Sequence, residues 1–143
     1  MSRLENRLAI VTGAATGIGH ATAKLFAQEG ATVICADVNT DELEKTVAAI
    51  KADGGKAEAH KLDVSDEEAV KAFAEELKQS HGYIDVLFNN AGVDQEGGKL
   101  HEYPTELFDR IMGIDLRGTF LVSKYIIPLM LDNGGSIINV ASM

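Results

Sequence analysis

Short apolar runs alternate along the chain with stretches of amphipathic character. The clearest runs are Leu8–Thr12, Thr32–Ala36, Ile84–Phe88 and Ser136–Val140, and a weaker one covers Lys56–Val64. Near-continuous apolar runs of this length are typical of strands that are buried on both faces. The pattern therefore predicts five strands.

Between the first two runs, apolar residues recur at helical spacing. Ile18, Ala21, Leu25 and Phe26 would share one face of a helix, and Gly30 follows them. Glycine is favoured just after the last turn of a helix because it adopts the left-handed backbone conformation without strain. We therefore expect a first helix that ends just before Gly30.

Later helices carry their own start signals. Asn39 and the segment Ser65–Glu68 each precede a stripe of apolar residues at helical spacing, as capping side chains do. A longer helical pattern covers residues 104 to about 131, and we expect it to bend near Gly113 or Gly118.

The alternation of strands and helices predicts the fold class. Strands that alternate with helices are joined by right-handed crossovers, which produce a parallel sheet with helices on both faces. We therefore expect residues 1–143 to form one α/β domain with a doubly wound parallel sheet, in the strand order 3-2-1-4-5.

Composition narrows the possible partners. The 143 residues are 45% hydrophobic, enough for a core, and carry a net charge of −9. We expect so acidic a chain to bind neither nucleic acid nor an anionic membrane. The single cysteine, Cys35, excludes a disulfide framework, and no two of the four histidines have metal-ligand spacing, so we expect no metal site. The first residues lack the apolar core of a signal peptide, which favours a cytoplasmic protein.

The first apolar run leads directly into Gly13-Ala14-Ala15-Thr16-Gly17-Ile18-Gly19. Glycines permit a tight turn, and the start of the following helix offers free N–H groups and a positive dipole to a pyrophosphate. A plain strand-to-helix turn is the alternative, but the strand before and the helix after favour a nucleotide-binding, Rossmann-type sheet. The residues that we expect to contact this cofactor are Gly13, Thr16, Gly17, Ile18 and Gly19.

Asp37 ends the second predicted strand, 18 residues beyond Gly19 (37 − 19). An acidic residue at about this offset accepts hydrogen bonds from the adenosine ribose hydroxyls. No Arg or Lys lies at positions 14–16, 38 or 39 to bind a 2′-phosphate, which favours NAD over NADP. A turn or helix-cap role for Asp37 is the alternative.

Four motifs together resemble the short-chain dehydrogenase/reductase family. They are Thr12–Gly19, Asp37, Leu62–Val64 and Asn89–Gly92, which stand in that family's order and spacing. The resemblance covers essentially the whole chain up to Met143, and as a set the motifs are highly specific.

The resemblance implies further cofactor contacts. Asp63 and the Val64 backbone would contact the adenine, while Asn90, Ala91 and Gly92 would line the cofactor cleft. Taken singly, Asp63 could simply precede a helix cap, and Asn90 and Gly92 could be turn residues.

The resemblance also places two catalytic positions. Ser142 matches the serine that hydrogen-bonds the substrate oxygen while hydride passes between the carbinol carbon and the nicotinamide. Asp115 occupies a position where the family usually has an asparagine, which holds a water in a proton relay. Aspartate keeps the size of asparagine but lacks its amide donors, so the relay would have to work differently here.

The family's general base, the tyrosine of Tyr-x-x-x-Lys, has no counterpart in residues 1–143. The residue four positions after Tyr83, Tyr103 and Tyr125 is a leucine in each case. The family fold continues for about 250 residues in all, a single-domain length. We therefore expect this chain to be the N-terminal part of a dehydrogenase, truncated before the later strands, and to have little activity alone.

Three functional hypotheses follow from these residues. The first is an NAD-dependent oxidoreductase that acts on a small secondary alcohol or the matching ketone. The second is a non-catalytic NAD-binding module that a partner completes, and the third is a truncated form without independent function. When complete, the protein is expected to be a homo-oligomer, dimer or tetramer, in which the apolar stretch Phe120–Leu131 is either interface or ordinary core.

Overall fold

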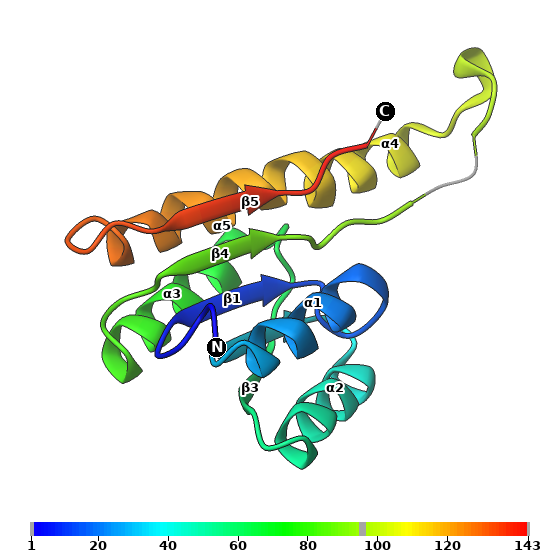
Figure 1. The fold of residues 1–143 in the computed structure, drawn as a ribbon. Helices are drawn as coiled ribbons and strands as arrows, with labels where there is room; N and C mark the ends of the chain where they lie inside the picture. Colours follow the sequence, from blue (N-terminus) through cyan, green and yellow to red (C-terminus); the bar gives the residue numbers. More distant parts are fainter. Residues whose placement is uncertain (1, 95–96, 143) are drawn as a thin grey trace.

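The computed structural model describes residues 2–94 and 97–142, and these residues form a five-stranded parallel sheet (Figure 1). The strand order is β3-β2-β1-β4-β5. The strands are β1 (Leu8–Thr12), β2 (Thr32–Asp37), β3 (Lys56–Lys61), β4 (Val86–Asn89) and β5 (Ser136–Asn139). The predicted fold class and the strand order 3-2-1-4-5 are therefore confirmed.

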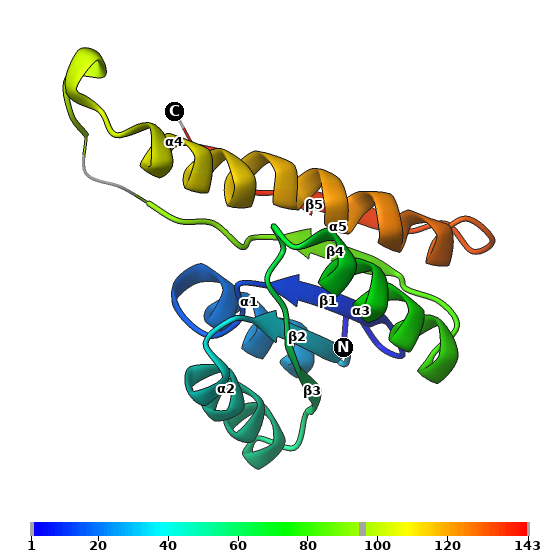
Figure 2. The same cartoon turned by 180° about the vertical axis from the view of Figure 1, so that it is seen from behind.

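Helices cover both faces of the sheet, as Figures 1 and 2 show from opposite sides. Helices α1 (Gly17–Gln28) and α2 (Thr40–Ala52) lie on one face, and α3 (Glu67–Ser80) and α5 (Thr119–Ile126) on the other. Helix α3 buries the stripe Val70, Phe73, Ala74 and Leu77. Helix α1 buries Gly19, Ala23 and Ala27, so the predicted face was wrong: Ile18, Ala21 and Leu25 are exposed. Strands β1 and β2 lie between the two layers, which explains why their central residues are apolar on both sides.

The ends of several elements differ from the predicted ones. The third strand stops at Lys61, three residues early, and the fourth begins at Val86, two residues later than predicted. Helix α3 is capped by Asp66, whose carboxylate accepts from the N–H of Ala69 (3.2 Å), and not by the serine before it. The predicted cap at Asn39 is confirmed.

The predicted long helix is one continuous rod with a different turn type in its middle (Figure 2). Helix α4 (Thr105–Ile111) leads into the π-helical segment η2 (Met112–Gly118), then into α5, and ends in the 3-10 turn η3 (Ile127–Leu129). A further 3-10 turn, η1 (Leu100–Glu102), precedes the rod. The predicted bend near Gly113 or Gly118 is replaced by this π-helical segment, which contains both glycines and has a wider turn than an α-helix.

Strand β5 forms one edge of the sheet and all four of its residues are exposed. Ile137 and Ile138 are 40% and 44% exposed, in contrast to the fully buried residues of β1. An uncovered apolar edge strand of this kind is a pairing surface for further polypeptide. Across the part of the chain that the structure describes, we find no helix with the length and apolarity needed to cross a membrane.

Asp85 joins the beginnings of three strands. Its buried carboxylate accepts hydrogen bonds from the backbone N–H of Leu8 (2.8 Å) and from the guanidinium of Arg7 (3.1 Å). Its own N–H donates to the carbonyl oxygen of Leu8, and its carbonyl oxygen accepts from the N–H of Ser136. The residue therefore connects β1, β4 and β5 at their amino ends.

We expect Asp85→Ala to lower the free energy of unfolding by about 1–3 kcal/mol, because the buried N–H of Leu8 loses its acceptor. Urea denaturation followed by circular dichroism measures the change. Asp85→Asn is the control: it keeps one carbonyl acceptor and should lose less. Equal unfolding midpoints for the wild type and Asp85→Ala would contradict the assigned role.

Candidate functional site

Two glycines in close contact shape the turn between β1 and α1. Gly13 has a φ of +65°, in the left-handed region that favours glycine. A Cβ atom on Gly19 would overlap the carbonyl oxygen of Gly13, so a larger residue there would force the turn apart. Together the glycines let the first turn of α1 lie directly against the end of β1.

The start of α1 presents free backbone donors. Thr16 is the N-cap residue, and its side chain makes no capping hydrogen bond. The first hydrogen bond of the helix runs from the N–H of His20 to the carbonyl oxygen of Thr16 (3.2 Å). The three N–H groups before it have no acceptor within the helix; they belong to Gly17, Ile18 and Gly19. These donors and the positive end of the helix fit the pyrophosphate of a dinucleotide.

Asp37, the last residue of β2, lies beside this turn. One carboxylate oxygen accepts a hydrogen bond from the N–H of Ala15 (3.1 Å), and the other accepts from the N–H of Asn39 (3.0 Å). The carboxylate is therefore fixed by backbone on both sides and keeps acceptor capacity for hydroxyl groups. Its position, at the end of a strand and against the glycine turn, fits a ribose.

Thr12 and Asn90 connect the turn after β1 to the loop after β4. The hydroxyl oxygen of Thr12 accepts from the N–H groups of Asn90 and Ala91, both at 3.0 Å. The amide of Asn90 in turn donates to the carbonyl oxygens of Thr12 (3.2 Å) and Gly13 (3.3 Å). The loop that begins with Asn90 is therefore held against the glycine turn.

The loop after β3 carries Asp63 and Val64. One carboxylate oxygen of Asp63 accepts from the N–H (2.9 Å) and the hydroxyl (2.6 Å) of Ser65. The side chain of Val64 is buried and packs against Gly118, where a Cβ atom would collide with it. This contact brings the loop after β3 together with the end of η2.

Segment η2 places Asp115 over the loop after β4. The carboxylate of Asp115 accepts a hydrogen bond from the N–H of Val93 (2.8 Å), and its Oδ1 lies 3.3 Å from where a Cβ on Gly92 would be. The hydroxyl of Thr119 donates to the carbonyl oxygen of Asp115, which the π-helical geometry leaves accessible (3.1 Å). Asp115 and Gly92 are thus neighbours, a contact that the sequence did not predict.

Charged side chains hold η2 and α5 against α3. Arg117 donates to the carbonyl oxygen of Ser65 (2.7 Å), and Glu67 accepts from the hydroxyl of Tyr125 (2.8 Å) and the ammonium of Lys124 (3.2 Å). These hydrogen bonds, first that from Tyr125 and then that from Lys124, hold the pKa of Glu67 below its ordinary value. The carboxylate is therefore ionised at neutral pH and keeps both partners.

Ser142 lies three residues beyond the end of β5 and is exposed. Strand β5 is positioned there by Asn89, whose amide donates to the side chains of Asn139 and Ser123 (3.0 Å each). Because the strands are parallel, their carboxyl ends meet at one edge of the sheet, on the arrowhead side in Figure 1. The predicted residues gathered along this edge are Gly13, Thr16, Gly17, Ile18, Gly19, Asp37, Asp63, Val64, Asn90, Ala91, Gly92, Asp115 and Ser142.

The sequence analysis missed two residues beside the glycine turn. The buried hydroxyl of Thr46 lies 3.1 Å from the carbonyl oxygen of Ala14, and His20 lies 2.8 Å from the same hydroxyl. The sequence predicted His20 on the first helix but gave it no role. A threonine inside the apolar stripe of α2 was the available signal, because a buried hydroxyl requires a partner.

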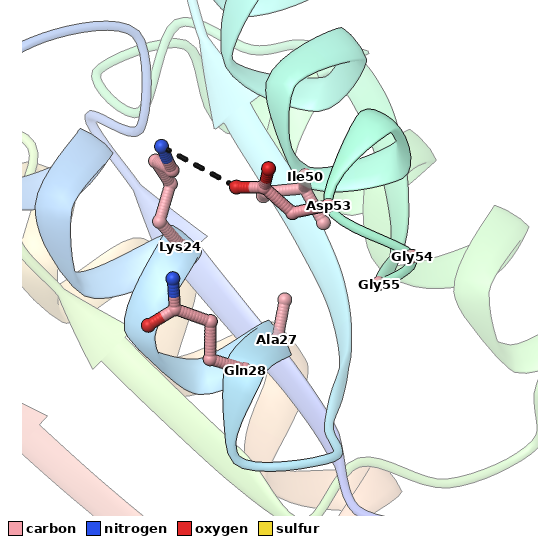
Figure 3. A pocket seen from close by; sticks show the side chains of 7 residues that line it. All are labelled: Lys24, Ala27, Gln28, Ile50, Asp53, Gly54 and Gly55. Atoms are coloured by element: carbon pink, nitrogen blue, oxygen red, sulfur yellow. Dashed lines mark ion pairs between the residues drawn. The ribbon is translucent and has the colours of Figure 1, made fainter.

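Two hollows of the surface lie away from the glycine turn. One, of about 160 Å³, lies between the last turns of α1 and α2 and contains the ion pair of Lys24 and Asp53 (3.6 Å; Figure 3). Its lining residues come from the ends of these helices that are opposite the turn. A second hollow, of about 430 Å³, lies on η2 and is lined by Asp109, Met112, Gly113, Leu116, Arg117 and Phe120.

Metal and thiol chemistry have no support in the described part of the chain. Residues 2–94 and 97–142 contain no group of three His, Cys, Asp or Glu side chains placed to hold a metal ion. Burial raises the pKa of Cys35, in the middle of β2, to about 12. This side chain is therefore a neutral thiol that packs as a small apolar residue.

Comparison with known proteins identifies the family. The model of the family described as short chain dehydrogenase matches residues 7–143. The chain is 68% identical over 143 residues to the uncharacterized oxidoreductase YxbG of Bacillus subtilis (strain 168), covering all of this chain and 52% of that protein. It is 40% identical over 142 residues to the 3-oxoacyl-acyl-carrier-protein reductase FabG of Thermotoga maritima, covering 99% of this chain and 57% of that protein.

Solved structures show the same architecture. A metagenomic short-chain oxidoreductase in complex with NADP superposes with a TM-score of 0.94 at 37% identity, over 98% of this chain and 64% of that one. NAD+-bound xylitol dehydrogenase also gives a TM-score of 0.94 at 37% identity, over 99% of this chain and 55% of that one.

The chain spans about half the length of the curated relatives that it matches. Its sequence match nevertheless runs from Arg7 to the last residue and includes every strand of the sheet described above. Both of these structural neighbours were solved with a nicotinamide dinucleotide bound. The chain belongs to the short-chain dehydrogenase family.

Proposed function

We propose that the protein is an NAD-dependent oxidoreductase that interconverts a small secondary alcohol and its ketone. The observation that carries this proposal is the carboxylate of Asp37, held by the N–H of Ala15 at the glycine turn (3.1 Å). An acceptor at this place hydrogen-bonds free ribose hydroxyls and repels a 2′-phosphate. No Arg or Lys at positions 14–16, 38 or 39 offsets that repulsion, which favours NAD over NADP.

Residues 1–143 would serve as the cofactor-binding domain. The free N–H groups at the start of α1 would bind the pyrophosphate, since a helix N-terminus favours anions. Asp63 and the Val64 backbone would contact the adenine, and the loop after β4 would lie along the nicotinamide half. The residues proposed to bind NAD are Gly13, Thr16, Gly17, Ile18, Gly19, Asp37, Asp63, Val64, Asn90, Ala91 and Gly92.

Two side chains are proposed to act on the substrate side. When bound, NAD accepts or supplies the hydride. Ser142, beyond the end of β5, would donate a hydrogen bond to the substrate oxygen and orient it. Asp115 uses one oxygen to accept the N–H of Val93, as the oxygen of an asparagine could also do. The two residues differ at the other atom, where aspartate accepts and asparagine donates, so a relay water would have to donate its proton to Asp115.

The general base would come from a Tyr-x-x-x-Lys segment outside residues 1–143, since none of the three tyrosines within them has that spacing. A neighbouring lysine lowers the pKa of a tyrosine, so that more of the tyrosine is the phenolate, the form that can accept a proton from an alcohol. We therefore propose that residues 1–143 alone bind NAD without turnover.

Self-association is proposed through the outer face of α4 and η2. Phe108, Met112, Leu116 and Phe120 follow one another at intervals of four residues, and all are exposed, Leu116 by 62%. An exposed apolar patch of this continuity is typical of protein interfaces. A second copy of the chain is the proposed occupant, because a two-fold axis would pair the stripe with itself.

Asp37→Arg should raise the dissociation constant of NADH at least about tenfold and lower that of NADPH, because the ribose loses an acceptor and a 2′-phosphate gains a cation. Fluorescence titration of the native-length protein measures both constants. Asp41→Arg, the same charge change at an exposed position of α2, should alter neither. If the ratio of the NADH and NADPH dissociation constants is unchanged in Asp37→Arg, the ribose does not bind at Asp37.

Ser142→Ala in the native-length protein should lower kcat about 10²- to 10³-fold, the usual effect of removing one donor to a reacting oxygen. Turnover is measured by NADH absorbance with a panel of secondary alcohols and ketones, and the affinity for NADH should stay unchanged. Ser136→Ala, at the start of β5, is the matched control. Turnover by residues 1–143 alone would show that the base lies within them, and binding without turnover by the native-length protein would favour a non-catalytic module.

Leu116→Glu should shift the native-length protein to a smaller species in sedimentation velocity. Association would bury an unpaired carboxylate from each copy in the interface, which is unfavourable. Leu100→Glu is the control, since Leu100 is 92% exposed and lies off the stripe. A wild type that sediments as a monomer, or a Leu116→Glu variant of unchanged mass, would refute an interface at this stripe.

A further inference from the structure

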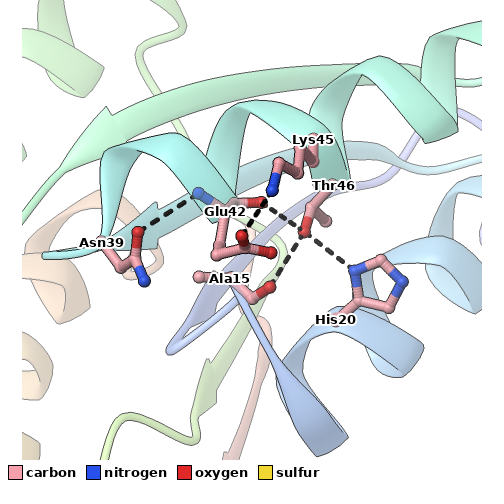
Figure 4. A network of polar contacts seen from close by, with 6 residues as sticks. All are labelled: Ala15, His20, Asn39, Glu42, Lys45 and Thr46. Atoms are coloured by element: carbon pink, nitrogen blue, oxygen red, sulfur yellow. Dashed lines mark hydrogen bonds and ion pairs between the residues drawn. The ribbon is translucent and has the colours of Figure 1, made fainter.

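Helix α2 supports the glycine turn through one buried hydroxyl. The side-chain oxygen of Thr46 is 3.1 Å from the carbonyl oxygen of Ala14, 3.3 Å from that of Ala15 and 3.2 Å from that of Glu42, one turn earlier in the helix. Thr46 is fully buried, so water does not compete for these contacts. Figure 4 shows this hydroxyl between α2 and the turn, with the ring of His20 on its other side.

The position of the single hydroxyl proton follows from its neighbours. Nδ1 of His20 lies 2.8 Å from the Thr46 oxygen and can donate or accept, depending on its tautomer. If the hydroxyl donated to His20, its oxygen would face the turn carbonyls with no proton between them. If His20 donates to Thr46, the hydroxyl proton is left for the carbonyl oxygens of Ala14, Ala15 and Glu42, which share this single donor. The second arrangement assigns the proton to Nδ1 of His20.

The peptide group between Ala14 and Ala15 is held from both sides. Its carbonyl oxygen, that of Ala14, faces Thr46 on α2 (3.1 Å), and its N–H, that of Ala15, donates to the carboxylate of Asp37 on β2 (3.1 Å). The preceding peptide is also bound to β2, because the N–H of Ala14 donates to the carbonyl oxygen of Ala36 (3.2 Å). Rotation of the Ala14–Ala15 peptide would break a contact on each side, and it would displace the donor that fixes Asp37.

We propose that Thr46 and His20 are positioning residues for cofactor selection. They hold the peptide between Ala14 and Ala15 in the orientation that fixes Asp37, and through Asp37 they set the preference for NAD over NADP. This inference rests on the proposed function of the turn. Neither side chain needs to touch the cofactor, because the hydrogen bonds behind a binding group determine how accurately that group is held.

The first test compares Thr46→Val with Thr46→Ser in the native-length protein. Valine keeps the shape and removes the hydroxyl, so the dissociation constant of NADH should rise about threefold to tenfold, the effect of one lost hydrogen bond. That of NADPH should rise less, because a loosened carboxylate repels the 2′-phosphate less effectively. Serine retains the hydroxyl and should restore the wild-type ratio of the two constants.

The second test uses His20, which is half-buried and tolerates substitution without a packing defect in the core. His20→Asn places an amide N–H close to the position of Nδ1. This variant should keep the wild-type ratio of the NADH and NADPH dissociation constants. His20→Leu has no donor and should shift the ratio in the direction of Thr46→Val. Lys45→Ala, an exposed neighbour that pairs with Glu42 on α2, is the control and should change nothing.

Thermal unfolding without cofactor separates positioning from stability. A residue that only stabilises the fold would change the melting temperature and leave the ratio of the two dissociation constants unaltered; that result overturns the inference. A wild type that binds neither dinucleotide overturns the proposed function together with the inference. A wild type that prefers NADH, with an unchanged ratio in Thr46→Val and His20→Leu, overturns the inference alone.

Discussion

The hydrogen bonds between Thr12 and Asn90 hold together the two strand ends on which the rest of the site depends. These residues are 78 positions apart in the sequence, yet one hydroxyl oxygen accepts from two successive N–H groups, and one amide donates back to two carbonyls. They join the carboxyl ends of β1 and β4. The chain that follows β1 runs to one face of the sheet, and the chain that follows β4 runs to the other. Ligands of open α/β sheets bind at such a point. The separation of these two strand ends is set here by side-chain hydrogen bonds.

Local sequence patterns were sufficient to predict the architecture. Each strand of the sheet followed from an apolar run, and the glycine spacing located the turn, because burial on two faces and a tight strand-to-helix connection restrict residue choice position by position. Element ends were less predictable. Asp85 looked like part of a strand, but its carboxylate accepts from Leu8, 77 residues away, and the strand begins one residue later.

The supporting hydrogen bonds of the site could not be predicted in this way. Thr46 reaches carbonyls 31 and 32 residues earlier, and no periodicity in α2 indicates which turn its hydroxyl faces. The position of Asp115 over Gly92 likewise depends on the π-helical turn, which the two glycines suggested only as a bend. The cofactor and catalytic roles of Asp63, Asn90, Asp115 and Ser142 came from family resemblance and remain proposals.

The π-helical turn also has a consequence for insertions and deletions. A π-helical turn holds about one residue more than an α-helical turn, and each residue of an α-helix rotates the chain by about 100°. Deletion of one residue between Met112 and Gly118 would restore regular helix geometry while α5 stays seated against the sheet through Leu121 and Val122. The extra residue of the π-helical turn is the one removed, so α4 would keep nearly the same orientation about its axis and Phe108 would stay in line with its exposed neighbours. The same deletion within regular α-helix would turn the preceding segment by about 100°. This segment therefore accommodates the loss of one residue better than an ordinary surface helix would.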